Sequence, residues 1–501
     1  MKEFIRFFIV TMLISNAPLV PAVGQGLNTT WLMGDQSMAR MIFTDTSYNI
    51  TPEVRKIPFI DTQGNISDSN GNLLMSSNGY FIADASGDTM MNGGGLNPNQ
   101  CTQDYGASDG MFLPYGNIIL PMPGDSNQYV LFHQTCDYAN PYLSSSEIYY
   151  SIIDISLNGG LGAVISKNNV ILNGIFGSGL SAVKHGNGRD WWIIALSDSG
   201  TVANRILLSP GSIQFIGSQN LQVTGYVAWA GQPTFSPNGE QFAFSHTKYL
   251  GTSQFPLDAR LFDFDRCLGN FTSKMFLALG DSAGGFGIGF SSNSKYLYVS
   301  STQVIYQFDT NNPNIPLSKT IVAVNDTFLS APPVFYTNFY LMYLAANGKI
   351  YVSSTSSVLD LHEMNFPDSA GIACDVQLHN IHVPHFFIGV PNHPNYYLGV
   401  LTGSVCDSLT STHEIIHDFK FSLSPNPSSG DFKILYLLTQ NQNGKLEIYD
   451  VNGRSIYEMN LPKWSTMQYI SLPSTIADGI YNCVISSGNS SVNKKLVVIR
   501  N

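Results

Sequence analysis

The chain of 501 residues is short of charge, since Asp, Glu, Lys and Arg make up only 12% of it, about half of the usual share. The formal net charge is −11, and no cluster of Lys and Arg occurs after the first ten residues. Binding to nucleic acid or to an anionic membrane surface needs a basic patch that neutralises phosphates. The composition therefore argues against both, and we expect no nucleic-acid partner.

Cysteine is scarce as well, with six residues, none of them spaced as Cys-x-x-Cys or in a zinc-finger pattern with histidine. We therefore expect no metal and no other cofactor. In an oxidising compartment the cysteines can form disulfides instead. We expect Cys101 to pair with Cys136 and Cys374 with Cys406, because each pair falls within one repeat unit or between neighbours. Buried free thiols are the alternative.

Long apolar runs are absent except at the N-terminus. Residues 1–24 combine Lys2 and Arg6 with an apolar stretch at 7–14 and small residues near position 24. This layout is typical of a secretory signal peptide and is too short for a membrane span; an uncleaved anchor is the alternative. No other stretch approaches the ~20 apolar residues of a membrane helix, so we expect a mature chain without a membrane span.

Aromatic and turn-forming residues are abundant by contrast, with 25 Tyr, 30 Phe, 45 Gly and 25 Pro. Residues 235–245 read FSPNGEQFAFS, and residues 290–300 repeat the pattern as FSSNSKYLYVS. Further copies begin near residues 74, 120, 183 and 344. Turns built on Asn-Gly favour antiparallel hairpins, and strands that are apolar on both faces are typical of stacked sheets.

A unit of about four strands repeated every ~50 residues is typical of a propeller blade. We therefore predict an all-β fold in which residues 27–408 form a WD40/YVTN-like β-propeller, with seven blades favoured over six or eight. A last blade that joins residues 31–44 to residues 385–401 would close the ring and leave no free sheet edge. A row of β-sandwich domains is the alternative, which the steady spacing disfavours.

The C-terminal part carries a different pattern. After a linker at 409–420, short alternating strands and Asn-Gly turns predict a small immunoglobulin-like β-sandwich over residues 421–501. Its motif residues are Pro425, Asn426, Pro427, Gly430, Asp450, Gly453, Gly479, Tyr481 and Lys495. In type and order they resemble the type A C-terminal sorting domain of the type IX secretion system of Bacteroidota.

The resemblance implies a route. The signal peptide would take the chain to the periplasm, and the type IX machinery, its expected partner, would recognise the C-terminal domain at the outer membrane. The protein would then be released or attached to the cell surface. Residues 262–271, 287–300 and 391–399 also look like the propeller cargo of the same bacteria. Because the activity of that cargo is generally unassigned, this second resemblance supports the fold alone.

Several short motifs suggest chemistry in an unsuitable context. The segment from His413 to His417 matches the zinc motif HExxH, but it lies in the linker without a helical pattern. The histidines at 379, 382, 385 and 393 cluster near Asp375. We interpret them as strand or loop histidines, because a strand places residues 379 and 382 on opposite faces. The stretch 68–72 lacks the final Glu of a calcium loop and is interpreted as a turn.

The sequence favours a binding or interaction propeller displayed outside the cell, with Asn-, Ser- and aromatic-rich loops that hold a glycan or a protein. The alternative is an extracellular polysaccharide-active hydrolase or lyase with its site at the propeller channel mouth. Asp263 and Asp265 share one strand face and suit either a carboxylate pair or a structural role at a blade turn. A structural surface-layer role is a third option, and no catalytic residue is assigned.

Overall fold

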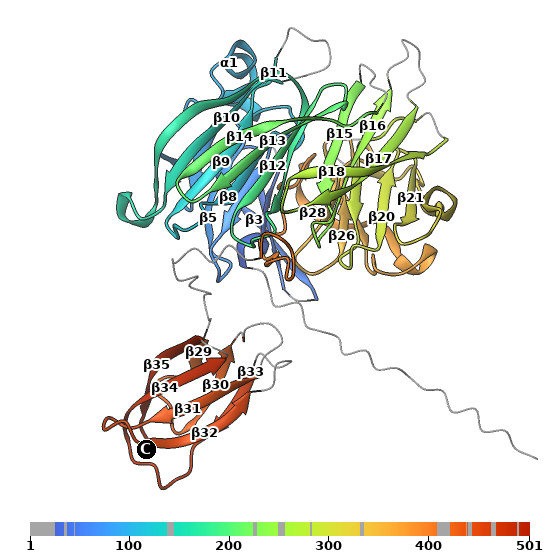
Figure 1. The fold of residues 1–501 in the computed structure, drawn as a ribbon. Helices are drawn as coiled ribbons and strands as arrows, with labels where there is room; N and C mark the ends of the chain where they lie inside the picture. The colour runs from blue at the N-terminus through green and yellow to red at the C-terminus, as the bar shows by residue number, and fades with distance from the viewer. Residues whose placement is uncertain are drawn as a thin grey trace, which may run out of the picture. The chain divides into compact units, whose positions relative to one another are not determined.

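The computed structural model describes residues 26–34, 38–44, 46–137, 145–223, 228–248, 256–280, 283–330, 335–407, 421–436, 438, 443–461, 467–487 and 490–500. The chain divides into two compact units, Met1–Leu409 and Thr410–Asn501 (Figure 1). The expected signal peptide at 1–24, the linker at 409–420 and the HExxH match within it lie outside the described residues.

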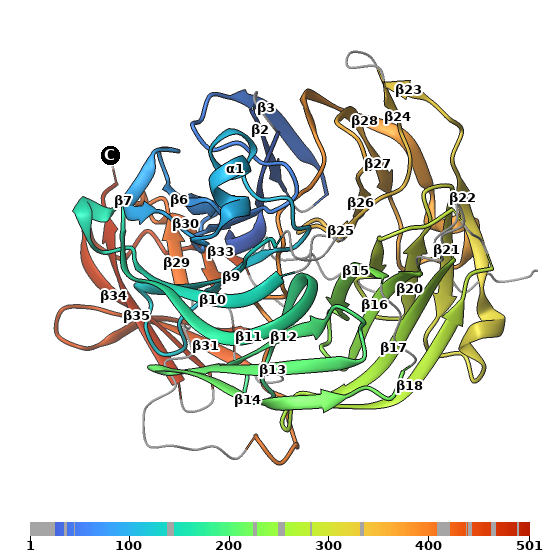
Figure 2. The same cartoon turned by 90° about the horizontal axis from the view of Figure 1, so that it is seen from above.

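The first unit consists of antiparallel sheets that stand around a common axis (Figure 2). In the part of the chain that the structure describes, their strands divide into seven blades, of which blades 2, 3 and 4 share one 11-stranded sheet. Blades 1 to 3 are built from β1 (Thr30–Met33), β2 (Met38–Phe43) and β3 (Tyr48–Glu53); β4 (Gly64–Ser67), β5 (Leu73–Ser77), β6 (Phe81–Asp84) and β7 (Thr89–Gly94); and β8 (Asn117–Pro121), β9 (Gln128–Gln134), β10 (Ser145–Asp154) and the first part of β11 (Ala163–Lys184).

Blades 4 to 7 follow in order. They are the last part of β11 with β12 (Trp191–Ser197), β13 (Val202–Ser209) and β14 (Ser212–Asn220); β15 (Ala228–Phe235), β16 (Gln241–Lys248), β17 (Leu257–Asp265) and β18 (Asn270–Ala278); β19 (Ile288–Phe290), β20 (Tyr296–Ser300), β21 (Val304–Asp309) and β22 (Thr320–Val324); and β25 (Met342–Leu344), β26 (Ile350–Val352), β27 (Val358–Met364) and β28 (Val376–Phe387). The remaining elements are the hairpin β23 (Leu329–Ser330) and β24 (Phe335–Tyr336), the helix α1 (Gln100–Asp109), and the short helices η1 (Gly26–Asn28), η2 (Asn158–Gly160), η3 (Ile315–Ser318) and η4 (Gly371–Cys374).

The strand β11 explains why blades 3 and 4 share a sheet. It has 22 residues, and it pairs with β10 between Ala163 and Phe176 and with β12 between Phe176 and Lys184. It is therefore the last strand of blade 3 and the first strand of blade 4. In each blade the first strand lies nearest the axis, as β15 and β18 of blade 5 show in Figure 2.

Apolar packing between neighbouring blades closes the ring. The clusters join blade 1 to blade 2, blades 2 to 4, blade 4 to 5, blade 5 to 6, blade 6 to 7, and blade 7 back to blade 1. In the last of these, Trp31 of blade 1 packs edge-on against Tyr351 of blade 7, with ring centroids 5.5 Å apart. Burial of aromatic side chains between the faces supplies the main stabilisation of such a ring.

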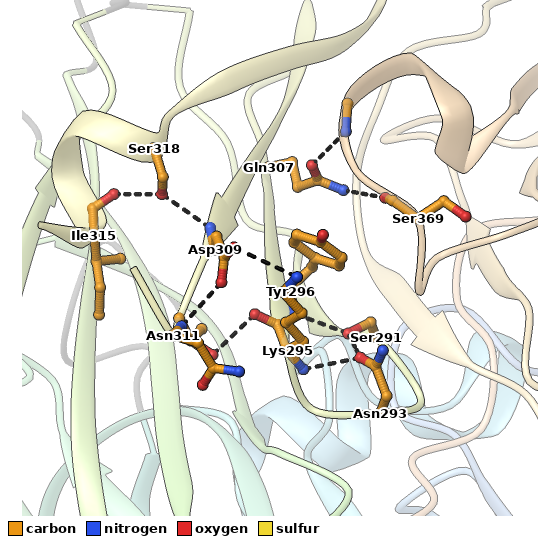
Figure 3. A network of polar contacts seen from close by, with 12 residues as sticks. Ser291, Asn293, Lys295, Tyr296, Gln307, Asp309, Asn311, Ile315, Ser318 and Ser369 are labelled. Atoms are coloured by element: carbon orange, nitrogen blue, oxygen red, sulfur yellow. Dashed lines mark hydrogen bonds and ion pairs between the residues drawn. The ribbon is translucent and has the colours of Figure 1, made fainter. Parts of the chain in front are cut away.

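The turns between first and second strands give the sequence repeat its physical basis (Figure 3). The Ser291 hydroxyl donates to Asn293 Oδ1 at 2.7 Å and accepts from the Tyr296 N–H at 2.8 Å. The Ser236 hydroxyl makes the same bond to Asn238 Oδ1, at 2.6 Å. Short polar side chains of this kind satisfy main-chain groups in turns, so the Ser-x-Asn pattern closes the first hairpins of blades 5 and 6. We call this end of the ring the turn end, and the opposite end the mouth end.

Two predictions about the repeat are wrong. The copy at 74–83 forms β5 and β6, and the true counterpart of the other hairpins is β4–β5, with its turn at 68–72. Asn78-Gly79 resembles the other turns in sequence but connects the second and third strands of its blade. The turn motif alone therefore does not show which two strands of a blade it connects. The expected mixed blade is also absent, because β1 to β3 form blade 1 by themselves and residues 388–401 lie outside the strands of the structure.

The disulfides confirm one expected pair and correct the other. Cys101 is joined to Cys136. Cys406 is joined to Cys267 and not to Cys374, which is a buried free thiol. Cys374 lies in η4, within the apolar cluster between blades 6 and 7, whereas Cys406 lies beside the β17–β18 turn. Burial raises the pKa of the Cys374 thiol to about 11, which keeps it protonated and unreactive.

The second unit is a sandwich of two antiparallel sheets. One sheet has the order β29 (Phe421–Ser424), β30 (Asp431–Tyr436), β33 (Met467–Ser471), and the other has the order β32 (Ser455–Leu461), β31 (Gly444–Tyr449), β34 (Gly479–Ser487), β35 (Ser490–Val498). Alternate residues of both sheets, such as Ile434, Ile448 and Leu496, fill a separate apolar core. Among the described residues no helix is long and apolar enough to cross a membrane.

Candidate functional site

After β28 the chain enters the axis of the ring, and we call residues 388–401 the axial segment. The Gly389 N–H donates to the carbonyl of Ile60 at 3.2 Å, and the Asn392 N–H donates to that of Gln63 at 3.2 Å. Asn392 Nδ2 also donates to the carbonyls of Asn117 and Leu180, at 3.1 and 2.8 Å. A single buried side chain thus joins the first strands of blades 3 and 4.

The axial segment continues along the axis toward the turn end. His393 Nε2 lies 2.6 Å from the Asn65 carbonyl, and the Tyr396 hydroxyl donates to the Ile119 carbonyl at 2.9 Å. Asn395 Nδ2 then donates to the carbonyl of Pro237 in the turn of blade 5, at 2.8 Å. The ring is therefore closed from the inside by its own chain, and this segment occupies the position where an open propeller has a channel.

The axial segment leaves the ring between the turns of blades 4 and 5. The Leu401 N–H donates to the Gly186 carbonyl at 2.7 Å. The guanidinium of Arg266 donates to the carbonyls of Lys184 and Gly399, at 2.9 and 2.6 Å, and only 3% of Arg266 is exposed. Burial lowers the pKa of Arg266 to about 10, so the side chain remains charged and holds the exit of the segment.

A cleft of about 690 Å³ opens at the turn end beside this exit; we call it the turn cleft. It is lined by Asn238, Glu240, Gln241, Asp263, Phe264, Asp265, Arg266, Cys267, Asn293, Ser294, Asn311, Leu401, Ser404 and Val405. The volume is in the range of small-ligand sites. The lining combines three carboxylates and three asparagine amides with the apolar side chains of Phe264, Leu401 and Val405.

Asp263 and Asp265 both line the turn cleft, but their side chains have different environments. Asp265 Oδ1 accepts the N–H groups of Cys267 and Leu268, at 2.8 and 3.1 Å, and thereby closes the β17–β18 turn. Asp263 is exposed and is free to meet a ligand. Glu240 was missed in the sequence, because it lies in the β15–β16 turn and only the pairing of β16 with β17 brings it beside the other two carboxylates.

His379, His382 and His393, interpreted from the sequence as strand or loop histidines, make separate contacts. His379 Nε2 lies 2.9 Å from Asp326 Oδ2, and His382 Nδ1 lies 3.0 Å from Asp360 Oδ1. Both belong to β28, as does His385, whereas His393 lies in the axial segment. Over the described ranges, no group of three or more His, Cys, Asp or Glu side chains is arranged to hold a metal ion.

At the mouth end, Asp61 is a further titratable group that the sequence did not single out. Its Oδ1 is buried without a hydrogen-bond partner, and its charge acts on the nearby Tyr340 and Tyr343. Burial raises the pKa of Asp61 to about 7, because a charged carboxylate is disfavoured away from water. The residue follows an ordinary Phe-Ile pair in the sequence, so only the fold reveals its environment.

In the second unit, Asn426 lies at an edge of the sandwich. Asn426 Nδ2 donates to the Lys495 carbonyl at 2.9 Å, and Asn426 Oδ1 accepts the Val497 N–H at 2.8 Å. The amide thus pairs with β35 as a neighbouring strand would. Pro425 and Pro427 flank it, each after a cis peptide bond, and Ser428 continues the contact through a bridge to Val498.

The other motif residues occupy separate places. Asp450 Oδ1 accepts the N–H groups of Asn452 and Arg454, both at 2.9 Å, which closes the β31–β32 turn around Gly453. On β34, which begins at Gly479, the Tyr481 hydroxyl donates to the Ala477 carbonyl at 2.6 Å. The motif residues therefore do not form one contiguous site, since Asn426 contacts Lys495 whereas Asp450 and Tyr481 make their hydrogen bonds elsewhere. These residues shape turns and an edge of the sandwich.

Comparisons with known proteins give one sequence match, which covers residues 422–499: the family described as "Secretion system C-terminal sorting domain". No curated protein matches the chain in sequence. Among solved structures, a putative 6-phosphogluconolactonase from Bacteroides uniformis is 13% identical, with a TM-score of 0.41, and the match covers 72% of this chain and 98% of that one.

Two other solved structures are similarly distant. Hydrazine synthase of Kuenenia stuttgartiensis is 9% identical, with a TM-score of 0.39 and coverage of 75% of this chain and 99% of that one. PorZ, an essential surface component of the type IX secretion system of Porphyromonas gingivalis, is 10% identical, with a TM-score of 0.27 and coverage of 95% and 76%. At these values the similarities transfer no activity, and the propeller follows from the sheet topology.

Proposed function

We propose that the propeller of this chain, which carries a type IX secretion C-terminal sorting domain and is exported to the cell surface or released, is a glycan-binding module. The observation that carries the proposal is the turn cleft, which combines carboxylates, amides and apolar side chains. Carboxylate and amide groups bind sugar hydroxyls, and the apolar side chains Leu401 and Val405 offer contact to a sugar face. No general base or nucleophile is needed for this role.

The charge of the turn cleft restricts the glycan. Glu240, Asp263 and Asp265 line it, while the guanidinium of Arg266 is directed to main-chain carbonyls. The cleft therefore suits neutral sugars or amino sugars and repels uronate or sulfated chains. The same test would also detect a protein partner. A stable protein interface buries about 800 Å² on each side, which is more than a small-ligand cleft offers.

The test is an array of neutral, amino and acidic oligosaccharides, together with surface proteins, probed with the full chain. We expect binding to a neutral or amino-sugar oligosaccharide, and we expect Asp263→Ala to weaken it at least about tenfold, the loss of one charged hydrogen bond. The matched control is Asp88→Ala, because Asp88 is an exposed carboxylate outside the cleft that pairs with Lys56. Equal binding by the two variants, or preference for acidic glycans, would refute the proposal.

A second candidate function is supported by Asp61 alone. A carboxyl with a pKa near neutrality can act as a general acid or base, and Asp61 lies at the mouth end, where a polysaccharide-active hydrolase or lyase would place its site. Release of new reducing ends from polysaccharide by the wild type, lost in Asp61→Asn and centred near pH 7, would favour this function. Activity that is equal in the two proteins would reject it.

A further inference from the structure

We propose that the turn cleft is completed by oxidation. In this view the Cys267–Cys406 disulfide holds residues 402–407 against blade 5 as one wall of the cleft, so a reduced chain lacks this wall. The inference concerns the regulation of the site described above and rests on the proposed function for its biological meaning. The geometry of the wall can be tested without a ligand.

The wall has few other attachments to the ring. Among the described residues, its hydrogen bonds between main-chain groups join Ser404 to Leu401, at 3.1 Å, and Asp407 to Ser404, at 3.2 Å. Both bonds lie within residues 401–407 and do not reach a blade. Val405, which lines the cleft, is 81% exposed and gains little from burial. Beyond Leu401, the disulfide is thus the main connection that fixes the position of the wall.

The ring is shaped to receive the disulfide. A Cβ atom on Gly186, in the turn of blade 4, would overlap both Cys267 Sγ and Cys406 Sγ. A Cβ on Gly188 would lie 2.6 Å from the Val400 nitrogen. Because glycine has no side chain, the disulfide can approach the main chain at Gly186, and Val400 can approach it at Gly188. The hydroxyl of Ser404 lies 3.2 Å from one sulfur and 3.3 Å from the other.

The chemistry balances as ordinary thiol–disulfide exchange. The thiols of Cys267 and Cys406 form one S–S bond by giving two electrons and two protons to an external disulfide, which becomes two thiols. A dithiol reverses the step and becomes oxidised to its own disulfide. Because disulfides persist outside the reducing cytosol, the wall would form only after export, and the cleft would be incomplete before it.

The test is hydrogen exchange of the full chain, followed by mass spectrometry of peptides from residues 402–407 and 263–268. The most informative protein is Cys101→Ser/Cys136→Ser. This variant lacks the Cys101–Cys136 disulfide, so a reductant acts on the Cys267–Cys406 disulfide alone. In the oxidised form we expect protection equal to that of the wild type. After addition of dithiothreitol, exchange in both peptides should become at least about tenfold faster.

A second variant guards against misfolding. Cys267→Ser/Cys406→Ser should show the fast exchange without any reductant, while far-UV circular dichroism confirms that the blades remain folded. Unchanged protection in either experiment would overturn the inference. So would an oligosaccharide that the oxidised and reduced chains bind with equal affinity.

The proposed function fails in a distinguishable way. Chitotriose, xylotetraose and mannotriose are suitable probes, and binding should weaken at least about tenfold on reduction. If none of the three binds the oxidised chain while exchange still responds to dithiothreitol, glycan binding is wrong, and the role of the disulfide in forming the wall is supported.

Discussion

At the scale of the residue, Gly430 and Gly453 of the sorting domain occupy similar backbone conformations in different surroundings. Their φ angles are +107° and +80°. A Cβ on Gly430 would lie 2.8 Å from Arg500 Nη2, whereas one on Gly453 would meet nothing within 4 Å. Both positions favour glycine because of the positive φ, but only Gly430 also makes room for a side chain, whose guanidinium donates to the Pro473 carbonyl at 3.0 Å.

This difference predicts that Gly430→Ala destabilises the second unit more than Gly453→Ala does. Both variants carry the backbone strain, so the excess, about 1–2 kcal/mol, measures the displaced Arg500. The measurement is the urea midpoint of the second unit in the full chain, followed by hydrogen exchange in β30 and β35. Equal midpoints would show that the contact with Arg500 contributes nothing.

At the scale of the element, the axial segment replaces the shared blade that the sequence suggested. Its contacts come from a stretch of Pro and Asn residues that has no strand or helix pattern. The sequence PNHPNYYLG reads as a loop, and a loop is normally placed on the surface. The carbonyls at the inner strands provide partners for its polar groups, so burial leaves few of them unsatisfied.

The role of this segment predicts that Asn392→Ala lowers the stability of the propeller. Asn392 Nδ2 serves two buried carbonyls, so its loss should cost about 2–3 kcal/mol. Asn395→Ala is the matched control, because Asn395 belongs to the same segment, is half-buried and bonds to one carbonyl. Thermal unfolding should show a clearly lower midpoint for Asn392→Ala, and identical midpoints would contradict the closing role of the segment.

At the scale of the whole molecule, buried histidines couple stability to pH. Burial lowers the pKa of His133 to about 3 and those of His362 and His393 to about 4, from an ordinary value of 6.5. Above pH 6.5 neither the folded nor the unfolded chain binds these protons. Between pH 6.5 and about 4 the unfolded chain binds more protons than the folded one, so stability falls as the pH falls.

We therefore expect the unfolding midpoint of the full chain to decrease steadily from pH 7 to pH 4.5. His393→Asn should reduce the dependence of the midpoint on pH, because the asparagine side chain binds no proton in the unfolded state. Asn395→Ala, which changes the same axial segment without removing a titratable group, is the control and should leave the dependence of the midpoint on pH unchanged. A dependence on pH that is the same in all three proteins would show that burial of His393 is not linked to stability.

Delivery also belongs to the whole molecule. Removal of residues 421–501 should leave the propeller folded, because the two units have separate apolar cores, and should abolish its appearance at the cell surface or in the medium. The control is Asp88→Ala, which changes an exposed residue of the first unit and leaves residues 421–501 intact. Fractionation of cells that express each protein gives the answer, and surface delivery of the truncated chain would refute the sorting role of the C-terminal domain.

The sequence by itself determined the all-β class, the hairpin repeat and the C-terminal sorting domain. These depend on short-range patterns, such as the Ser-x-Asn turn at Ser291 and the alternation of apolar residues, which act within a few residues of chain. Only the tertiary structure decided the partner of Cys406, the path of residues 388–401 and the meeting of Glu240 with Asp263. The first two depend on closure of the ring, which brings distant parts of the chain together, and the third depends on the pairing of β16 with β17. No local pattern encodes these contacts.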